Sequence, residues 1–264
     1  ALFLAGVIPG LLLGLVFVIY CIVSAIRHPD RVPMAVEEEV PDSPGQRRSE
    51  KISGTGIILL IFLVLGGIWA GVFTPTEAAG FGVAGSIVLG FAKGMGRKEF
   101  IEAILDAGRF TAPVMFLLIA GSMYAKLLAV SGSLDMIQML LTDTGLGTLG
   151  LLAIMTVVWL LLGALIDSIS DILLTVPIFV PMAMAVGIDP VAFAIYGIII
   201  IEAGLLTPPL GLLVFTVKSS VPDSSVTLSE IFIGAVPYWL LMLFVAVLVI
   251  VFPGLATWLP GLMF

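Results

Sequence analysis

The chain has 264 residues, of which 60% are hydrophobic and 11% are charged, and its formal net charge is −7. Because a soluble domain carries about 25% charged residues, this composition excludes a water-soluble fold and predicts a polytopic integral membrane protein. The eleven Lys and Arg residues form no basic stripe, so the expected partner is the lipid bilayer and not nucleic acid. The sequence has one histidine and no P-loop or GxSxG motif, which argues against an enzyme.

Residues 1–109 are predicted to form scaffold helices, with a cytoplasmic loop between the first two. Mainly apolar runs over 3–25, 52–72 and 77–92 predict three membrane spans. In residues 97–109, apolar and charged side chains fall on opposite helical faces. This pattern predicts an amphipathic arm helix that lies in the membrane interface.

Residues 110–220 form the second predicted region of the chain. A span over 110–130 precedes an apolar stretch, 149–187, that polar residues interrupt near its middle. This stretch is either two full spans or a re-entrant hairpin whose tip lies inside the membrane. The hairpin is favoured because it leaves ten of the eleven basic residues on one side, which the positive-inside rule makes cytoplasmic.

A second interruption lies in the apolar element 191–218. Pro208 and Pro209 remove two amide donors there, which predicts a discontinuous helix. Residues 221–264 are predicted to form a C-terminal scaffold helix over 231–251. The expected fold is all-α, with about six spanning helices, the re-entrant hairpin, the discontinuous helix and the interfacial arm.

The two interruptions mark the candidate site, because irregular backbone inside the lipid is tolerated only where protein buries it or where it lines a cavity. Thr207 before Pro208 predicts an N-cap followed by proline at the first helical position. Ser168, Ser170 or Asp171 is predicted to cap the second hairpin arm. Two helix N-termini that face a common point favour an anionic group, so these five residues are the substrate-binding candidates.

Oxygen atoms at the opposite helix ends favour sodium as a coupling ion. Free carbonyls are expected near Gly163, Glu202 and Gly204, and Thr207 adds a hydroxyl. Asp167 shows no capping role in the sequence, and an ionisable side chain inside the membrane is by default a functional candidate. These five residues are the sodium candidates, and no organic cofactor is expected.

Three stretches of the sequence resemble a known family. Residues 2–12 (LFLAGVIPGLL), 71–79 (GVFTPTEAA) and 202–211 (EAGLLTPPLG) are similar to the signature stretches of the large membrane subunit of TRAP transporters, the tripartite ATP-independent periplasmic transporters of the DctM family. Residues 167–190 are similar too, and the resemblance covers essentially all 264 residues. In two places the chain departs from the family, which often has Asp-Pro-Thr at 167–169 and an Asn shortly before the acid at 202.

The resemblance implies the C-terminal part of the large permease of an elevator-type, sodium-coupled symporter with an ion-transporter-like fold, multi-pass in the bacterial cell inner membrane. Such a permease imports small organic anions such as C4-dicarboxylates or sialic acid. It receives them from a periplasmic solute-binding protein and pairs with a small membrane subunit. The family's large subunit has two inverted halves, and this chain is similar to the second half and the span before it. The resemblance implies that residues 110–220 form one half of the transport domain. The missing N-terminal half of the permease is therefore a further expected partner, without which no transport is expected.

Two other classes of function are considered. The chain opens without methionine inside an apolar segment, which favours, for the isolated polypeptide, a non-transporting membrane scaffold or a split permease half that only docks partners. Asp167 and Asp171 suggest an intramembrane aspartyl protease. That class is disfavoured because the two acids lie four residues apart near one hairpin tip and do not resemble a catalytic dyad on two helices.

Overall fold

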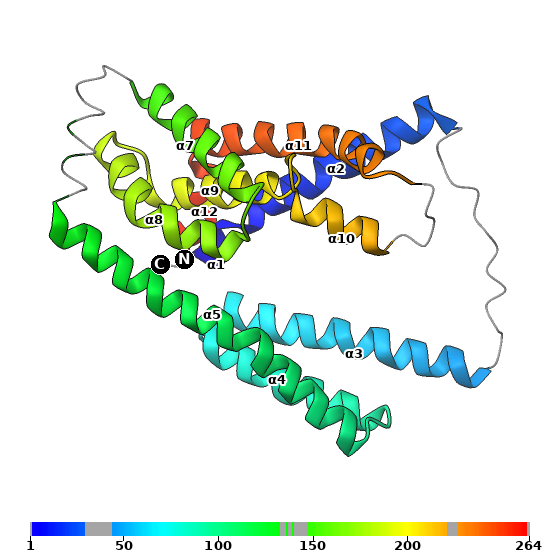
Figure 1. The fold of residues 1–264 in the computed structure, drawn as a ribbon. Coiled ribbons are helices and arrows are strands. Elements are labelled where there is room, and N and C mark those ends of the chain that lie inside the picture. Colours follow the sequence, from blue (N-terminus) through cyan, green and yellow to red (C-terminus); the bar gives the residue numbers. More distant parts are fainter. Residues whose placement is uncertain are drawn as a thin grey trace. The chain divides into compact units, whose positions relative to one another are not determined.

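The computed structural model describes residues 2–29, 44–132, 136, 139, 147–220 and 226–262. Within these ranges every regular element is a helix, which confirms the all-α prediction (Figure 1). The contacts divide the chain into two compact units, Ala1–Pro29 with Pro113–Phe264, and Asp30–Ala112. The division into 1–109, 110–220 and 221–264 according to transport role stays a prediction.

The unit formed by residues 30–112 is built on a helical hairpin. Its helices are α3 (Pro44–Trp69), α4 (Pro75–Ala92) and the first part of α5 (Arg97–Ser131). Helices α3 and α4 run antiparallel, because Gly56 lies against Leu89 and Gly85 lies against Leu60. The absent side chains of the two glycines leave room for the leucines, and the predicted spans over 52–72 and 77–92 fall in this hairpin.

Two helices begin with a capping box, in which a threonine and a glutamate satisfy the first amides of the helix. At the start of α4, the Glu77 amide donates to Thr74 Oγ1 over 3.3 Å and the Thr74 amide donates to Glu77 Oε2 over 2.8 Å. Thr227 and Glu230 repeat the arrangement before α11, with distances of 3.3 and 2.7 Å. Both starts follow from local sequence alone.

Helix α5 is continuous over 35 residues, with Pro113 inside it. The predicted arm over 97–109 and the predicted span over 110–130 are therefore one helix, and no break separates them. A single proline removes only one intrahelical hydrogen bond, so a long helix continues through it. The location of the first part of α5 in the membrane interface stays a prediction.

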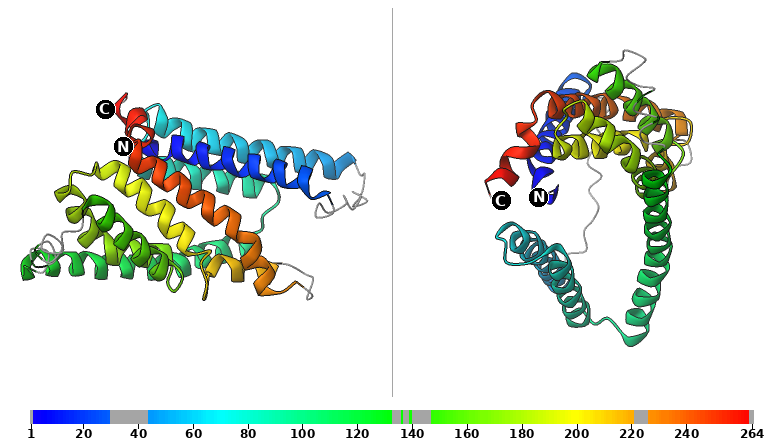
Figure 2. Two further views of the ribbon diagram at one scale, coloured as in Figure 1. Left: turned by 90° about the horizontal axis from the view of Figure 1, so that it is seen from above. Right: turned by 90° about the vertical axis from the view of Figure 1, so that its left-hand side faces the viewer.

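The unit formed by residues 1–29 and 113–264 is a helical bundle around α9. Besides the second part of α5, its helices are α1 (Leu2–Ala5), α2 (Val7–Arg27), α7 (Thr148–Gly163), α8 (Ser168–Ala185), α9 (Pro190–Gly204), α10 (Leu212–Ser220), α11 (Leu228–Val251) and α12 (Gly254–Gly261). Helix α9 buries ten of its fifteen residues, as expected for a helix that is apolar on all sides. It packs against α7, α8, α11 and α12, and α11 also lies against α2 (Figure 2).

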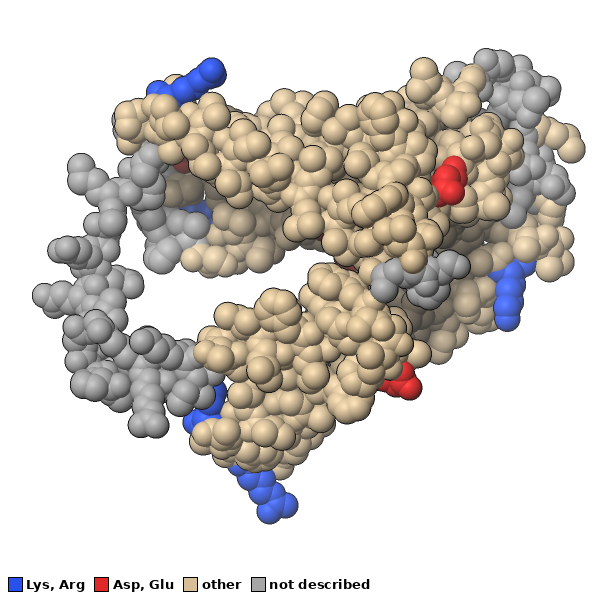
Figure 3. Space-filling view, turned by 180° about the vertical axis from the view of Figure 1, so that it is seen from behind, with Lys and Arg blue, Asp and Glu red and all other residues tan. Residues whose placement is uncertain are grey.

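Helix lengths agree with a membrane protein that has interrupted elements. Four helical stretches in the described residues are long and apolar enough to cross a membrane, namely Leu2–Arg27, Arg97–Ser131, Ser168–Ala185 and Leu228–Val251. Helices α7 and α9 have only 16 and 15 residues. At about 1.5 Å per residue they are shorter than the hydrocarbon core of about 30 Å, which fits helices that end inside it. The surface seen in Figure 3 has few charged side chains, as expected for contact with lipid.

The C-terminal end contains one element that the sequence did not predict. Helix α11 corresponds to the predicted scaffold helix over 231–251. The eight-residue α12 follows it and buries Ala256 completely. A helix this short, with Pro260 inside it, shows too few turns for its periodicity to be recognised.

Candidate functional site

Both predicted interruptions are present. Helix α7 ends at Gly163 and α8 begins at Ser168, so a four-residue turn forms the tip of a helical hairpin. Helix α9 ends at Gly204 and α10 begins at Leu212. The chain is therefore non-helical at the two places where the polar, glycine and proline residues predicted a break.

Asp167 caps α8, so the interpretation that it has no capping role was wrong. Its Oδ1 accepts hydrogen bonds from the amides of Ile169 (3.0 Å) and Ser170 (3.1 Å), and its Oδ2 accepts one from Ser170 Oγ (2.5 Å). Ser168, Ser170 and Asp171 lie inside α8, so none of them is the predicted cap. The backbone amides at this helix end were predicted to bind a substrate anion, but two of them already donate hydrogen bonds to Asp167.

Thr207 and Pro208 do not begin the second half of the discontinuous helix, as had been predicted. The Thr207 amide donates to the Gly204 carbonyl over 2.8 Å, and its Oγ1 donates to the Ala203 carbonyl over 3.0 Å. Thr207 thus completes the end of α9. The peptide bond between Pro208 and Pro209 is cis, and α10 begins only after Gly211, whose φ of +56° glycine adopts without strain.

Gly163 and Gly204 bring the C-terminal ends of α7 and α9 into direct backbone contact. A Cβ atom on Gly163 would lie 3.0 Å from Gly204 Cα and 2.9 Å from the Ile201 carbonyl oxygen. A Cβ atom on Gly204 would lie 2.9 Å from Gly163 Cα and 3.1 Å from the Trp159 carbonyl oxygen. Only glycine fits at both positions, so these two sodium candidates also have a packing role.

Two further hydrogen bonds tie the hairpin to the discontinuous helix. Ser168 Oγ donates to Glu202 Oε1 over 2.8 Å, which joins the first turn of α8 to the last turn of α9. The Gly211 amide donates to the Ala164 carbonyl over 3.3 Å, which joins the start of α10 to the hairpin tip. All four helix ends therefore lie together, and they include the predicted site residues on both sides.

Helices α7 and α9 run parallel, so their carbonyl ends point the same way. Midway along the two helices Thr156 and Tyr196 are hydrogen-bonded through their hydroxyls, and at their C-terminal ends Gly163 meets Gly204. The C-terminal ends carry partial negative charge, as does Glu202 in the last turn of α9. The junction thus concentrates oxygen atoms and negative potential, which suits a cation.

Asp171 is completely buried, and neither carboxylate oxygen has a hydrogen-bond partner among the described residues. Thr175, one turn later in α8, accepts a hydrogen bond from Trp159 Nε1 (2.8 Å) and donates one to the Asp171 backbone carbonyl (2.7 Å). The sequence did not identify Trp159 and Thr175 as part of this region. Thr175 lies inside an apolar run, and a buried hydroxyl requires a hydrogen-bond partner, so its position could have indicated a contact with another helix.

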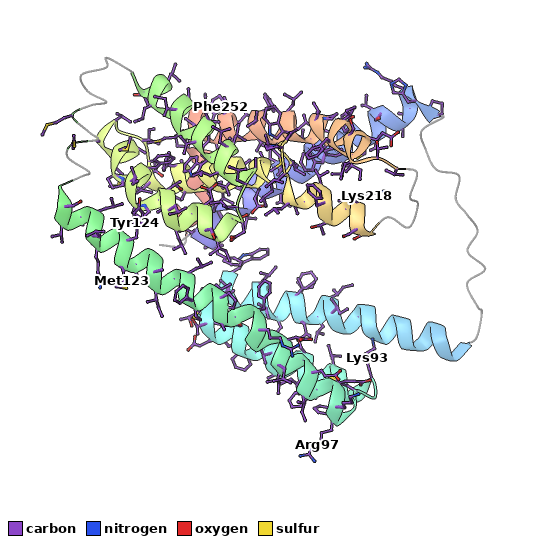
Figure 4. The ribbon with its side chains drawn as sticks, in the orientation of Figure 1. Lys93, Arg97, Met123, Tyr124, Lys218 and Phe252 are labelled. Atoms are coloured by element: carbon purple, nitrogen blue, oxygen red, sulfur yellow. The ribbon has the colours of Figure 1, made fainter. Side chains whose placement is uncertain are left out.

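An apolar pocket of about 340 Å³ lies beside the interruption between α9 and α10. Thr207 and Pro208 line it, together with residues of α11 that include Trp239. The buried indole Nε1 of Trp239 has no hydrogen-bond partner among the described residues, so it offers a donor close to the pocket. Lys218 lies at the far end of α10, away from the interruption (Figure 4).

The oxygen ligands available at the four helix ends suit a monovalent cation better than a transition metal. In the described part of the chain no group of three or more His, Cys, Asp and Glu side chains is placed to hold a metal. The sequence has no Lys, Arg or His between Lys126 and Lys218, so no basic side chain of the hairpin or of α9 offsets the acids. In broken-helix transporters, unwound backbone carbonyls and the C-terminal ends of half-helices coordinate sodium.

Comparison with known proteins agrees with this architecture. The family model of the tripartite ATP-independent periplasmic transporter, DctM component, matches residues 1–255. The C4-dicarboxylate TRAP transporter large permease of Pseudomonas aeruginosa is 32% identical over 98% of this chain and 59% of its own length. The sialic acid TRAP transporter large permease of Vibrio cholerae is 33% identical over 99% of this chain and 60% of its own length. The ectoine/5-hydroxyectoine TRAP transporter large permease of Ruegeria pomeroyi is 29% identical over 100% of this chain and 60% of its own length.

The match to the family model covers almost the whole chain, and the chain spans about 60% of the length of these curated relatives. Similarity to three permeases with different named substrates means that the family, and not one substrate, is established. The apolar helices of both units agree with a location in the bacterial inner membrane. The chain therefore belongs to the DctM family, the large permease components of TRAP transporters.

Proposed function

We propose that this chain forms part of a sodium-coupled secondary transporter that imports small organic anions such as C4-dicarboxylates or sialic acid. The observation that carries the proposal is the junction of four helix ends, held by the Gly163–Gly204 contact and the Ser168–Glu202 hydrogen bond. Interrupted helices that meet in this way are typical of secondary transporters, in which helix ends bind ions and substrates.

The sodium ion is proposed to bind at the carbonyl ends of α7 and α9. Gly163, Gly204 and Thr207 supply backbone or hydroxyl oxygens, and Asp167 and Glu202 supply carboxylates from the same junction. The partial negative charge at two parallel helix ends supports a cation there, and a bound cation would reduce the repulsion between the acids.

The substrate is proposed to bind beside the sodium, near Ser168, Ser170, Asp171, Thr207 and Pro208. Support comes from the pocket of about 340 Å³ next to Thr207 and Pro208, a size that accommodates a small organic molecule. Asp167 already uses two amides of α8, so an anion would need other donors. The indole of Trp239, which has no hydrogen-bond partner among the described residues, is one such donor.

The partners are proposed from the family. They are a periplasmic solute-binding protein that delivers the substrate, a small membrane subunit and the N-terminal half that the family's large permease carries. The relatives are named for C4-dicarboxylate, sialic acid and ectoine, so organic acids and zwitterions are the compounds to test first. An elevator movement of the hairpin and α9 against the remaining helices is part of the proposal.

The test is uptake of radiolabelled substrate by proteoliposomes that contain the chain together with these partners. Succinate, sialic acid and ectoine are supplied with either an inward sodium gradient or an equal concentration of choline chloride. Uptake of at least one of them that requires sodium supports the proposal. A complex that assembles stably but takes up none of them in either salt would instead support the non-transporting scaffold.

A further inference from the structure

A second cavity, of about 210 Å³, lies between α8 and α9 and has the form of a groove. The two helices pack against each other and are joined by a short turn, so they run antiparallel. Helix α8 lines the cavity with Ile172, Val176 and Val180, which are four residues apart and share one helical face. Helix α9 lines it from Phe193 to Ile201. The groove therefore follows both helices for about two turns, or about 12 Å.

The floor of the groove is the indole ring of Trp159, which is held by both helices. A Cβ atom on Gly197 of α9 would lie 2.8 Å from Trp159 Cη2, so the glycine lets the ring reach the α9 backbone. On the other side, Trp159 Nε1 donates a hydrogen bond of 2.8 Å to Thr175 of α8. The depth of the groove is thus fixed by the packing of three helices.

The lining of the groove excludes polar occupants. Every lining residue is apolar or glycine, and the indole N–H of Trp159 is already bonded. Water in such a cavity would find no hydrogen-bond partner, and an organic anion would lose its hydration without compensation. The sequence has no Lys, Arg or His between Lys126 and Lys218, so α8 and α9 carry no basic side chain for a phosphate. The occupant is therefore an uncharged, apolar group.

The rim of the groove is open and continues the lipid-facing surface of the protein. Ile198 exposes 45% of its surface and Leu2 exposes 54%. Helix α8 is one of the helices long and apolar enough to cross a membrane, and the chain belongs to a family of membrane permeases, so the medium at the rim is hydrocarbon. The cavity is smaller than the roughly 300–1,000 Å³ of pockets for drug-sized ligands, and its elongated form suits a single alkyl chain.

We propose that the groove between α8 and α9 binds one acyl chain of a membrane phospholipid. The chain lies along α8 from Ile172 to Val180 and rests on the Trp159 indole. It supplies α8 and α9 with van der Waals contacts that an empty cavity lacks. The groove recognises the chain and not the headgroup, so phosphatidylethanolamine and phosphatidylglycerol bind alike. This role goes beyond transport and does not depend on the coupling ion or on the substrate.

The test is photo-crosslinking in proteoliposomes that contain the chain with its proposed partners, without sodium or substrate. The bilayer includes phosphatidylethanolamine with a diazirine group in the middle of one acyl chain, and peptide mass spectrometry locates the labelled residues after illumination. Labelling of both Val176 on α8 and Ile198 on α9 is expected. Labelling confined to other helices would overturn the proposal. So would labelling of these two residues in the isolated chain only, because the rest of the transporter would then cover the groove.

A variant that fills the groove gives a second readout. Ala194 lines the groove, and a leucine side chain there cannot share the space with an acyl chain, so Ala194→Leu is expected to lower the labelling of Val176 and Ile198 about tenfold. Ala120→Leu is the matched control, because it makes the same exchange at an exposed position of α5. The control should label like the unmodified chain, and equal labelling of Ala194→Leu would contradict the proposal.

The headgroup is tested with phosphatidylglycerol that carries the same photoreactive chain. The same two residues should be labelled to a similar extent, because no basic side chain of α8 or α9 distinguishes the headgroups. Labelling by only one of the two lipids would show that the headgroup is recognised and would overturn binding through the chain alone. The uptake experiment is read separately, so failure of sodium coupling and failure of lipid binding are distinguishable.

Discussion

The Ser168 hydroxyl donates a 2.8 Å hydrogen bond to Glu202 and so connects the first residue of α8 with the last turn of α9. Both side chains are half-buried. The two residues are 34 positions apart in the sequence, and each lies beside an interruption of a helix. A hydrogen bond to a charged group contributes about 1.5–3 kcal/mol, so this contact is strong enough to couple the position of the hairpin tip to that of α9.

Replacing Ser168 tests that coupling. Ser168→Ala removes the donor and leaves the half-buried Glu202 carboxylate without its partner, so sodium-dependent uptake by the assembled transporter is expected to fall about tenfold. Ser168→Thr keeps the hydroxyl and should retain most of the activity. Equal uptake by the alanine and threonine variants would show that the bond does not contribute to transport.

Alanine at Gly163 or Gly204 is expected to destabilise the fold. The new Cβ would lie within about 3 Å of backbone atoms that cannot move aside independently, and overpacking of this kind costs about 1–3 kcal/mol. Gly234→Ala in α11 is the matched control, because nothing lies within 4 Å of its Cβ position and alanine favours a helix. Thermal unfolding in detergent should show a lower midpoint for the first two variants only.

Two substitutions at Asp167 separate its capping role from an ionic role. Asp167→Asn retains a good capping side chain and should leave the unfolding midpoint nearly unchanged, whereas Asp167→Ala should cost about 1 kcal/mol. If Asp167 also binds sodium, both variants lose sodium dependence of uptake. An asparagine variant with normal sodium dependence would leave Asp167 with the capping role alone.

The buried bond between Trp159 and Thr175 is expected to stabilise the hairpin. Thr175→Val has nearly the same volume but cannot accept the indole hydrogen, so the free energy of unfolding should fall by about 1–3 kcal/mol. Thr175→Ser retains the acceptor and should lose less. Chemical unfolding followed by tryptophan fluorescence measures both, and similar losses in the two variants would indicate that the lost methyl group matters more than the bond.

The local features of the sequence predicted the positions of most helices and of both interruptions. Long apolar runs predicted the membrane helices, because nearly every side chain that faces lipid must be apolar. Threonine, proline and glutamate at fixed spacing predicted the starts of α4 and α11, because a capping box involves only neighbouring residues. Similarly, glycine and proline predicted where the helices end, since both act on the backbone at their own positions.

The sequence did not determine which residues meet at the interruptions. Asp167 was misjudged because a cap is identified by where the turn ends, and the polar run 167–171 offered several choices one residue apart. The contact between Gly163 and Gly204, the bond between Ser168 and Glu202, and the complete burial of Asp171 depend on how α7, α8 and α9 pack. Packing joins residues some 40 positions apart in the chain, and no local pattern records such pairings. The sequence alone thus determined an interrupted, all-helical membrane protein, and only the tertiary structure decided which helix ends meet and which acid is enclosed without a partner.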